Sequence, residues 1–359
     1  MHERHFVFIF SVITGFYAPP IPGDSDKVLQ YMSKLRVGVI GVGNLGQHHA
    51  RILAGMKNDV ELVGVADTDE NRAREIAKKN GTEAYTDYHA LLEKIQAVSV
   101  VVPTQFHHIV GRACLQRGVH MLLEKPITST LEQADDLLKL SRDNKVIMQI
   151  GHIERFNPAI RAVQKLNPRP IYIDVERQGP FPPRMSDTSV VIDLMIHDID
   201  IVMLFKGEMP VRVDAVGSPV FTETEDIASA RLEFADGCVA QLAASRISRA
   251  RKRMITLYCE DRAIVADYMK QNAVAFRLGG GTPANKGDQM RRIHMERTSM
   301  QKDEPLKLEL QSFIKCVKSG GEPEVSGEKA RAALAIAEKV VQDIRSRLKR
   351  FRSGSGGSV

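Results

Sequence analysis

A charged pair and a proline end one apolar run of this sequence. Residues 119–124 read VHMLLE, which is typical of a buried strand, and Lys125 and Pro126 follow directly. Proline cannot continue the hydrogen-bond ladder of a strand and fixes its own φ, so the chain turns at a defined point. An ammonium group held there can polarise a substrate oxygen or lower the pKa of a hydroxyl. The alternative is an ordinary Glu–Lys pair on the surface.

A second group of ionisable residues lies in the segment DLMIHDID, residues 193–200. On a helix, Asp193 and His197 are one turn apart on one face. The flanking residues are nearly all apolar, and ionisable groups in such surroundings need a partner or a task. A histidine can take a hydroxyl proton near neutral pH, and Asp193 can orient its imidazole. A core histidine with a capping carboxylate is the alternative, and no third ligand has a spacing that would predict a metal site.

A glycine-rich motif precedes both groups. Residues 35–46 read LRVGVIGVGNLG, a strand that runs into Gly41-x-Gly43-x-x-Gly46 and opens a helix. Gly41 permits a tight turn, Gly43 lets the backbone approach a pyrophosphate, and Gly46 lets the helix pack close to the strand. The motif predicts a dinucleotide-binding loop made of Gly41, Gly43, Asn44, Leu45 and Gly46.

An acidic residue, Asp67, ends the next apolar run, residues 60–66. A carboxylate at that strand end can accept hydrogen bonds from both ribose hydroxyls of an adenosine. It would repel a 2′-phosphate, so the sequence favours NAD over NADP. The alternative is that Asp67 caps the helix that begins near Glu70.

These residues need elements to position them, and the first half of the chain alternates apolar runs with amphipathic stretches. Continuous apolar strands separated by helices predict a parallel sheet covered on both faces, with ligands at the carboxyl ends of the strands. Lys125 would then lie beside the nicotinamide half of a cofactor. The predicted strands are 35–40, 60–66, 97–102, 119–124 and 145–151, and the predicted helices are 45–57, 69–79, 107–117 and 130–143.

The pattern changes after residue 151. An apolar helix is predicted at about 189–205, and successive β-rich runs at 211–220, 228–245, 253–259 and 263–268 predict a mostly antiparallel sheet, with a hairpin turn at Asp236-Gly237. Residues 278–304 are predicted to be loop, and two helices close the chain at 305–319 and 327–348. The predicted fold is α/β, an N-terminal Rossmann domain (32–152) followed by a C-terminal α/β domain with a large open sheet (153–350). Residues 1–31 are predicted to be an extension outside the fold, and 351–359 a flexible tail.

Composition narrows the class of protein. The chain has 359 residues and a net charge of +6, which suits anionic ligands but falls short of a nucleic-acid-binding protein. Four scattered cysteines without a C-x-x-C pair predict reduced thiols and a cytoplasmic location. The apolar run at 6–18 is too short to span a bilayer, so no membrane partner is predicted. A start codon placed too far upstream explains residues 1–31 better than secretion does.

From about residue 33 to 345, the chain resembles the glucose-fructose oxidoreductase / inositol dehydrogenase / rhizopine-catabolism family of NAD(P)-dependent sugar oxidoreductases. The resemblance is carried by the glycine loop, Pro103-Thr104-x-x-His107, Glu124-Lys125-Pro126, and Asp193 with His197. It implies a homodimer or homotetramer formed through the open sheet. It also implies that Lys125 contacts substrate and nicotinamide, that His197 is the acid/base and that Asp193 binds a substrate hydroxyl or orients the histidine. Thr104 and His107 would lie along the cofactor, and Glu124 beside its ribose.

Two further stretches, GHIERFNP (151–158) and DLMIHDIDIV (193–202), resemble the branch of this family that oxidises UDP-N-acetylglucosamine at its 3-hydroxyl. That branch implies a UDP-sugar substrate and a ketone that a downstream aminotransferase consumes, for the diamino sugars of lipid A. Arg155 and Asn157 are candidates for sugar or phosphate contacts, although Asn157 could merely start a helix. Arg246, in the arginine-rich stretch 245–253, could grip a diphosphate, and a basic hairpin facing water is about equally compatible with that stretch.

Three other functions remain open on the sequence. The same chemistry could act on a free sugar, an inositol or a UDP-sugar acid. A relative that reduces a non-sugar such as a biliverdin-like molecule would not need the Asp193 and His197 pair. A nucleotide-sensing regulator would be non-catalytic, and such proteins typically lose the lysine or the histidine.

Overall fold

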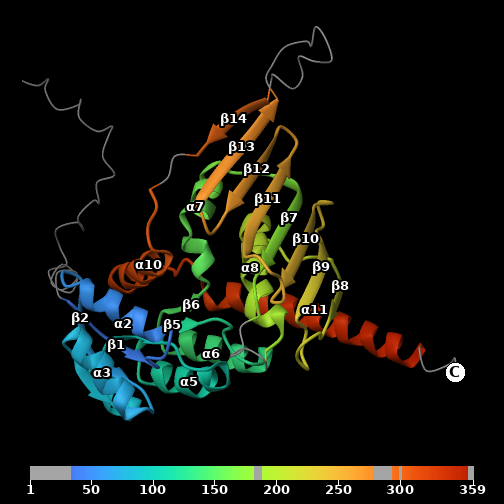
Figure 1. The fold of residues 1–359 in the computed structure, drawn as a ribbon. Helices are drawn as coiled ribbons and strands as arrows, with labels where there is room; N and C mark the ends of the chain where they lie inside the picture. Colours follow the sequence, from blue (N-terminus) through green and yellow to red (C-terminus); the bar gives the residue numbers. More distant parts are fainter. Residues whose placement is uncertain (1–33, 182–187, 279–292, 299–300, 355–359) are drawn as a thin grey trace, which may run out of the picture.

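Two sheets joined by helices make up the protein (Figure 1). The computed structural model describes residues 34–181, 188–278, 293–298 and 301–354, so the extension predicted for 1–31 lies outside the described residues. The first sheet is parallel throughout, in the order β3-β2-β1-β4-β5-β6. Its strands are β1 (Leu35–Ile40), β2 (Val60–Ala66), β3 (Glu83–Tyr85), β4 (Ala97–Val100), β5 (His120–Glu124) and β6 (Met148–Gly151).

Five helices of this half cover the sheet, and all but α4 match predicted ones. They are α2 (Gly46–Gly55), α3 (Glu70–Asn80), α4 (Tyr88–Leu92), α5 (His107–Gln116) and α6 (Leu131–Asp143), with a 3₁₀ turn, η1 (Thr104–Phe106). The predicted doubly wound sheet is confirmed. The sequence analysis missed β3 and α4, which are both short. Strand β3 has three residues that are mostly exposed, so no apolar run indicates it, and α4 has five residues.

The second sheet has eight strands in the order β14-β13-β12-β11-β7-β10-β9-β8 and is mostly antiparallel, as predicted. Its strands are β7 (Pro170–Gln178), β8 (Arg212–Ser218), β9 (Ile227–Glu233), β10 (Val239–Ser245), β11 (Lys252–Cys259), β12 (Arg262–Asp267), β13 (Asn272–Leu278) and β14 (Ile293–Arg297). The central strand β7 was missed because Arg177 follows Ile173 and Val175 on the inward face and interrupts the apolar alternation. The loop predicted for 278–304 is wrong at β14, whose exposed residues pair with β13 only through the backbone.

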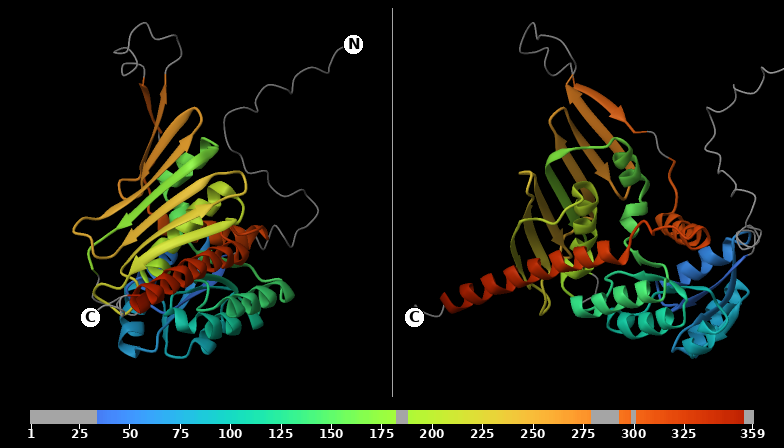
Figure 2. Two further views of the ribbon diagram at one scale, coloured as in Figure 1. Left: turned by 90° about the vertical axis from the view of Figure 1, so that its right-hand side faces the viewer. Right: turned by 180° about the vertical axis from the view of Figure 1, so that it is seen from behind.

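Helices cover one face of this sheet and leave the other open (Figure 2). They are η2 (Ile153–Phe156), α7 (Pro158–Lys165), α8 (Ile196–Lys206) and α11 (Gly327–Gly354), and a π-helical turn, η4 (Val191–Met195), precedes α8. Residues 351–354 belong to α11, so the flexible tail predicted for 351–359 is wrong at these four residues, and residues 355–359 lie outside the described residues. In the described part of the chain, no helix is both long enough and apolar enough to cross a bilayer.

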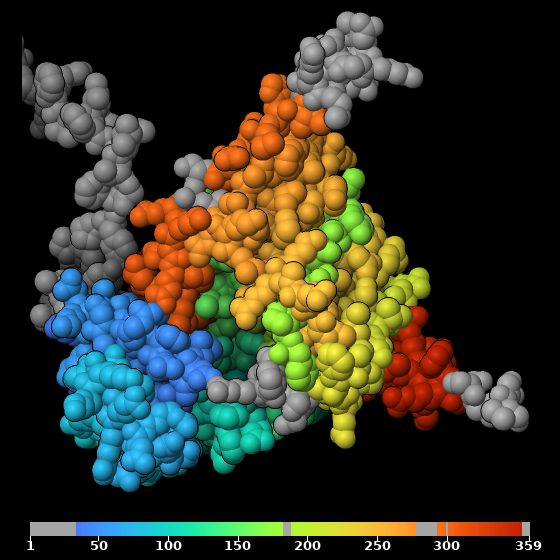
Figure 3. All heavy atoms as spheres, viewed as in Figure 1, coloured from blue at the N-terminus to red at the C-terminus, as the bar shows by residue number. Residues whose placement is uncertain are grey.

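The last structured segments return to the first domain. Helix α10 (Pro305–Ser319) inserts Leu310, Phe313 and Ile314 into the same apolar cluster as Val37 and Leu53. In Figure 3 its orange atoms lie against the blue atoms of the first domain. The predicted segment 153–350 is therefore not one unit in space, because α10 packs against α2 of the dinucleotide-binding half. Sequence order alone could not reveal this, since an amphipathic helix does not specify which surface it covers.

Helix α10 also buries a carboxyl group, Glu309, whose side chain is fully inaccessible to solvent. Neither carboxylate oxygen has a hydrogen-bond partner among the described residues. Burial, and then the nearby Glu124 charge, raises the pKa of Glu309 well above its ordinary value. Folding therefore favours the protonated form of this side chain.

Glu309→Gln is expected to increase the free energy of unfolding at pH 8 by at least about 1 kcal/mol, because the amide needs no added proton. Since the pKa is raised in the folded state, the gain should shrink as pH falls toward the unfolded value. Urea denaturation at pH 8 and pH 5 measures both effects. Glu322→Gln, at an exposed position, is the control, and a loss of stability in Glu309→Gln at pH 8 would contradict the burial argument.

Candidate active site

A cleft of about 730 Å³ opens at the carboxyl ends of strands β1, β2, β4 and β5. Gly41 has a φ of +84°, and a Cβ added at Gly46 would lie 1.8 Å from the Gly41 carbonyl oxygen, so both positions require glycine. A Cβ added at Gly43 would meet nothing within 4 Å, so this part of the loop is open to a ligand. The loop geometry fits a pyrophosphate at the start of α2.

Asp67 holds the glycine loop and faces the cleft. Its carboxylate accepts hydrogen bonds from the Val42 N–H (2.9 Å) and the Asp69 N–H (2.9 Å). The Arg72 guanidinium, which the sequence analysis did not single out, lies 3.3 Å from the same carboxylate and lines the cleft. Asp67 is therefore not the cap of α3, because Asp69 accepts from the Arg72 N–H in that role.

The other predicted cofactor residues divide into two groups. His107 is buried, with its ring nitrogens 2.8 Å from the Pro126 carbonyl and 2.9 Å from the Val102 carbonyl, so it holds two loops together and does not reach the cleft. The prediction that His107 lies along the cofactor is therefore corrected to a structural role. Among the predicted residues, the cleft is lined by Gly41, Gly43, Leu45, Asp67, Glu124 and Lys125, and Asn44, Gly46, Thr104 and His107 lie outside its lining.

Lys125 reaches from the cleft to the second domain. Its Nζ donates to the Asp193 carbonyl oxygen (2.7 Å) and lies 3.2 Å from Asp193 Oδ1. The two side chains are 17% and 15% exposed, which excludes the simple surface pair. Glu124, one residue earlier, lies 3.3 Å from the Nε2 of His49, a buried histidine that the sequence analysis missed. The end of β5 thus carries ionisable groups with specific partners.

The helix predicted for 189–205 starts with the π-helical turn η4. This turn changes the positions of Asp193 and His197 relative to those expected on a regular α-helix. Asp193 lies in the π-helical turn and faces Lys125, and His197 lies in α8. The Nδ1 of His197 has no hydrogen-bond partner among the described residues, so the predicted orienting bond from Asp193 is not formed. A single π-helical turn often marks a functional site, because it shifts the side chains that follow it.

His197 is suited to accept a proton. Burial, followed by the positive charges of Lys125 and Arg177, lowers the pKa of His197 well below the ordinary histidine value. The imidazole is therefore neutral at physiological pH and can take a proton from a hydroxyl. A second histidine, His152, is buried with its ring centroid 6.3 Å from that of His197. The polar residue directly after β6 was the signal for it in the sequence.

Neutral histidines that are buried or partly buried give a pH dependence of stability. Burial is the first cause that lowers the pKa of His107, His120, His152 and His197. The unfolded chain binds their protons more readily, so the free energy of unfolding should fall as pH drops from 7 through 6.5 toward 5. Denaturant titrations in the Glu309→Gln background, which lacks the opposing dependence, measure this. A flat profile there would contradict the prediction.

Arg155 and Asn157, predicted to contact substrate, have internal partners instead. The Arg155 guanidinium forms a two-point ion pair with Asp200, with Nε and Nη2 each 2.7 Å from a carboxylate oxygen. Asn157 accepts from the Ala159 N–H as the N-cap of α7 and donates to the Tyr268 carbonyl. Both side chains are almost fully buried, so the predicted contacts are corrected to structural roles.

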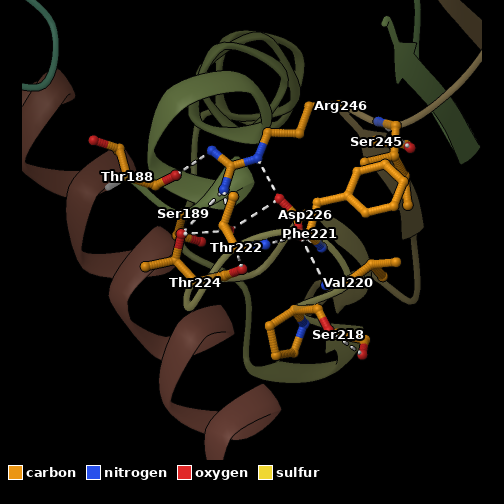
Figure 4. A network of polar contacts seen from close by, with 12 residues as sticks. Thr188, Ser189, Ser218, Val220, Phe221, Thr222, Thr224, Asp226, Ser245 and Arg246 are labelled. Atoms are coloured by element: carbon orange, nitrogen blue, oxygen red, sulfur yellow. Dashed lines mark hydrogen bonds and ion pairs between the residues drawn. The ribbon is translucent and has the colours of Figure 1, made fainter. Parts of the chain in front are cut away.

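Arg246, predicted to grip a diphosphate, is also an internal residue (Figure 4). It is 1% exposed, and its Nε donates to Asp226 Oδ1 at 2.7 Å. Its other nitrogens donate to the Thr188 carbonyl and to the hydroxyls of Thr222 and Thr224. Because the Val190 N–H donates to the Glu225 carbonyl in the same region, this network ties the start of the π-helical turn to the loop before β9. Arg246 therefore supports the site without lining it.

Comparisons with known proteins agree with this geometry. A family model described as an oxidoreductase family with an NAD-binding Rossmann fold matches residues 35–152, and the GFO/IDH/MocA C-terminal domain matches residues 168–265. The fold and the site are those of a sugar oxidoreductase that uses a nicotinamide dinucleotide. The chain belongs to the GFO/IDH/MocA family of oxidoreductases.

Several relatives are similar over nearly their full length. UDP-N-acetylglucosamine 3-dehydrogenase of Acidithiobacillus ferrooxidans is 36% identical over 86% of this chain and 97% of its own length. Its solved structure has a TM-score of 0.81 over 88% of this chain and 99% of that chain, at 34% identity. Myo-inositol 2-dehydrogenase of Thermotoga maritima is 30% identical over 87% of this chain and 98% of its own.

Proposed function

We propose that the protein oxidises the 3-hydroxyl of UDP-N-acetylglucosamine to a ketone, with NAD as the cofactor. The single observation that carries the proposal is the Lys125–Asp193 contact, which joins the dinucleotide cleft to the helix that bears the neutral His197. The similarity to the Acidithiobacillus enzyme supports the choice of substrate.

Each residue has a defined task in this proposal. A nicotinamide cofactor, when bound, supplies the hydride acceptor. Lys125 donates a hydrogen bond to the substrate oxygen and stabilises the negative charge that develops on it. His197 accepts the hydroxyl proton, and Asp193 holds the lysine ammonium in place. Positioning by the two domains supplies much of the rate.

NAD rather than NADP follows from Asp67, whose carboxylate would repel a 2′-phosphate. Asp67→Ser is expected to raise the NADP-to-NAD ratio of kcat/KM by about tenfold or more, because repulsion is removed and Arg72 loses one of its two carboxylate partners. Initial rates with both cofactors measure this ratio. Asp69→Ser, which retains a capping side chain and leaves Asp67 intact, is the control. An unchanged ratio in Asp67→Ser would remove the argument for NAD.

Two further proposals concern the surroundings of the reaction. Oxidation of a secondary alcohol by NAD is unfavourable at neutral pH, so an aminotransferase that consumes the ketone is expected downstream, in synthesis of lipid A diamino sugars in the cytoplasm. The open face of the second sheet carries exposed side chains such as Tyr172, Val216, Ile227 and Tyr258, and we expect it to form a homodimer or homotetramer interface.

The test is NADH formation by the protein with NAD and UDP-N-acetylglucosamine, with hydroxylamine present to trap a ketone. Free N-acetylglucosamine and myo-inositol are the comparison substrates, since the Thermotoga relative favours an inositol as the second candidate. Turnover of the nucleotide sugar alone supports the proposal. Turnover of inositol or the free sugar alone replaces the substrate, and tight NAD binding without any turnover favours a nucleotide-sensing regulator.

A further inference from the structure

Among the described residues, an arginine on the inner face of the second sheet, Arg253, has no ion pair within 4 Å and no hydrogen-bond acceptor. Arg253 lies near the start of β11 and pairs in register with Arg177 of β7. It shares the side of the strand with Ile255 and Leu257, both buried, so its side chain points to the face that α8 covers. The side chain is partly buried.

The neighbouring charges are already paired with one another. Arg177 donates from Nε and Nη2 to the two oxygens of Asp198, each at 2.8 Å, and from Nη1 to Glu154 at 3.0 Å. Asp200 forms its two-point pair with Arg155. Among the described residues, no side chain or carbonyl accepts a hydrogen bond from the Arg253 guanidinium.

A guanidinium that lacks a hydrogen-bond acceptor in this position does not stabilise the folded state. Burial, followed by repulsion from the Arg177 guanidinium, lowers the pKa of Arg253. The charges of Glu154 and Asp198 favour the charged form of Arg253, but both carboxylates accept hydrogen bonds from Arg177, so the donors of Arg253 have no acceptor among the described residues. Arg253 also lies on the His197 side of the sheet, since its charge is one of those that lower the pKa of His197.

We infer that Arg253 binds the diphosphate of a nucleotide-sugar substrate whose sugar lies between Lys125 and His197. This inference rests on the proposed function and adds the residue that recognises the anionic part of the substrate. A guanidinium presents two parallel N–H donors that match phosphate oxygens, and the bound anion would supply the acceptors that no described residue provides. Within the stretch 245–253, Arg246 has its donors engaged internally, whereas no described residue accepts from the Arg253 guanidinium.

The test is calorimetric binding of UDP to the protein in the presence of NADH, with UDP-N-acetylglucosamine kinetics in parallel. Arg253→Gln is expected to weaken UDP binding by about 10- to 100-fold, and Arg253→Lys by less. The KM for UDP-N-acetylglucosamine should rise by a similar factor, with kcat changed only a few-fold. Without ligand, Arg253→Gln should melt no lower than the wild type, because no internal contact is lost. Arg251→Gln, at an exposed neighbouring position, is the control and should bind UDP as the wild type does.

The outcomes separate the two claims. If the wild type binds no UDP, or if Arg253→Gln binds UDP as tightly as the wild type, the inference is overturned, whatever the activity shows. If UDP binds through Arg253 but UDP-N-acetylglucosamine is not oxidised, the inference holds and the proposed reaction falls. If UDP-N-acetylglucosamine is oxidised with the same KM by the wild type and Arg253→Gln, the proposed reaction holds and the inference is wrong.

Discussion

Lys125→Met is expected to lower kcat/KM for the oxidised sugar by about a thousandfold, with most of the loss in kcat. The methionine preserves the length of the side chain but removes the donor that stabilises negative charge on the substrate oxygen. It also leaves the carboxylate of Asp193 without its cation at 3.2 Å. Initial-rate kinetics with varied sugar concentration separate the effects on kcat and KM.

Two controls make the Lys125 result interpretable. Lys139→Met removes an exposed lysine of α6 and should leave the kinetics unchanged. NAD binding by Lys125→Met, measured by calorimetry, should stay within a few-fold of the wild type, because the glycine loop and Asp67 are intact. Activity within tenfold of the wild type would show that Lys125 does not stabilise the transition state.

Asp226→Ala is expected to lower the free energy of unfolding by about 3–5 kcal/mol, because it removes the buried carboxylate that accepts from the Arg246 guanidinium and from three backbone N–H groups. Asp226 is fully buried and accepts from the N–H groups of Val220, Phe221 and Thr222 as well as from Arg246. Burial opposes its charge, but these N–H groups and the guanidinium hold the pKa of Asp226 far below its usual range. Urea denaturation at pH 7.5 measures the loss.

A double mutant tests whether the ion pair is the source of this loss. Asp226→Ala combined with Arg246→Met should be clearly less destabilised than the sum of the single variants, because the two side chains form one buried ion pair and their losses are not additive. Asp214→Ala, which breaks a partly exposed pair with Arg347, should lose less than about 1 kcal/mol. A loss below that value in Asp226→Ala would show that the network in Figure 4 does not stabilise the fold.

The sequence predicted the dinucleotide-binding half well because its signals are local. The strands of the parallel sheet are buried over most of their length, so most of their residues are apolar, and Gly41 and Gly46 are required by backbone geometry that other residues do not satisfy. The second half was predicted less completely. Its strands alternate, and Arg177 occupies an inward position where an apolar residue would normally complete the pattern.

The catalytic candidates and the arginines show where local reasoning ends. Types and spacing were sufficient to select Lys125, Asp193 and His197, because ionisable groups in apolar segments need a partner or a task. Spacing could not show that a π-helical turn directs Asp193 to Lys125 and away from His197. Nor could it tell which arginine of 245–253 has an internal carboxylate, since Asp226 is twenty residues from Arg246 in the chain.

The sequence by itself therefore determined the parallel sheet, the dinucleotide loop and the residue types of the site. Only the tertiary structure decided which charges are compensated and which remain for a ligand. The physical reason is that a charge is available for binding only when no partner has been brought to it, and those partners come from strands and loops distant in the chain. Arg155, Arg177 and Arg246 each have a buried carboxylate, and Arg253 has none among the described residues.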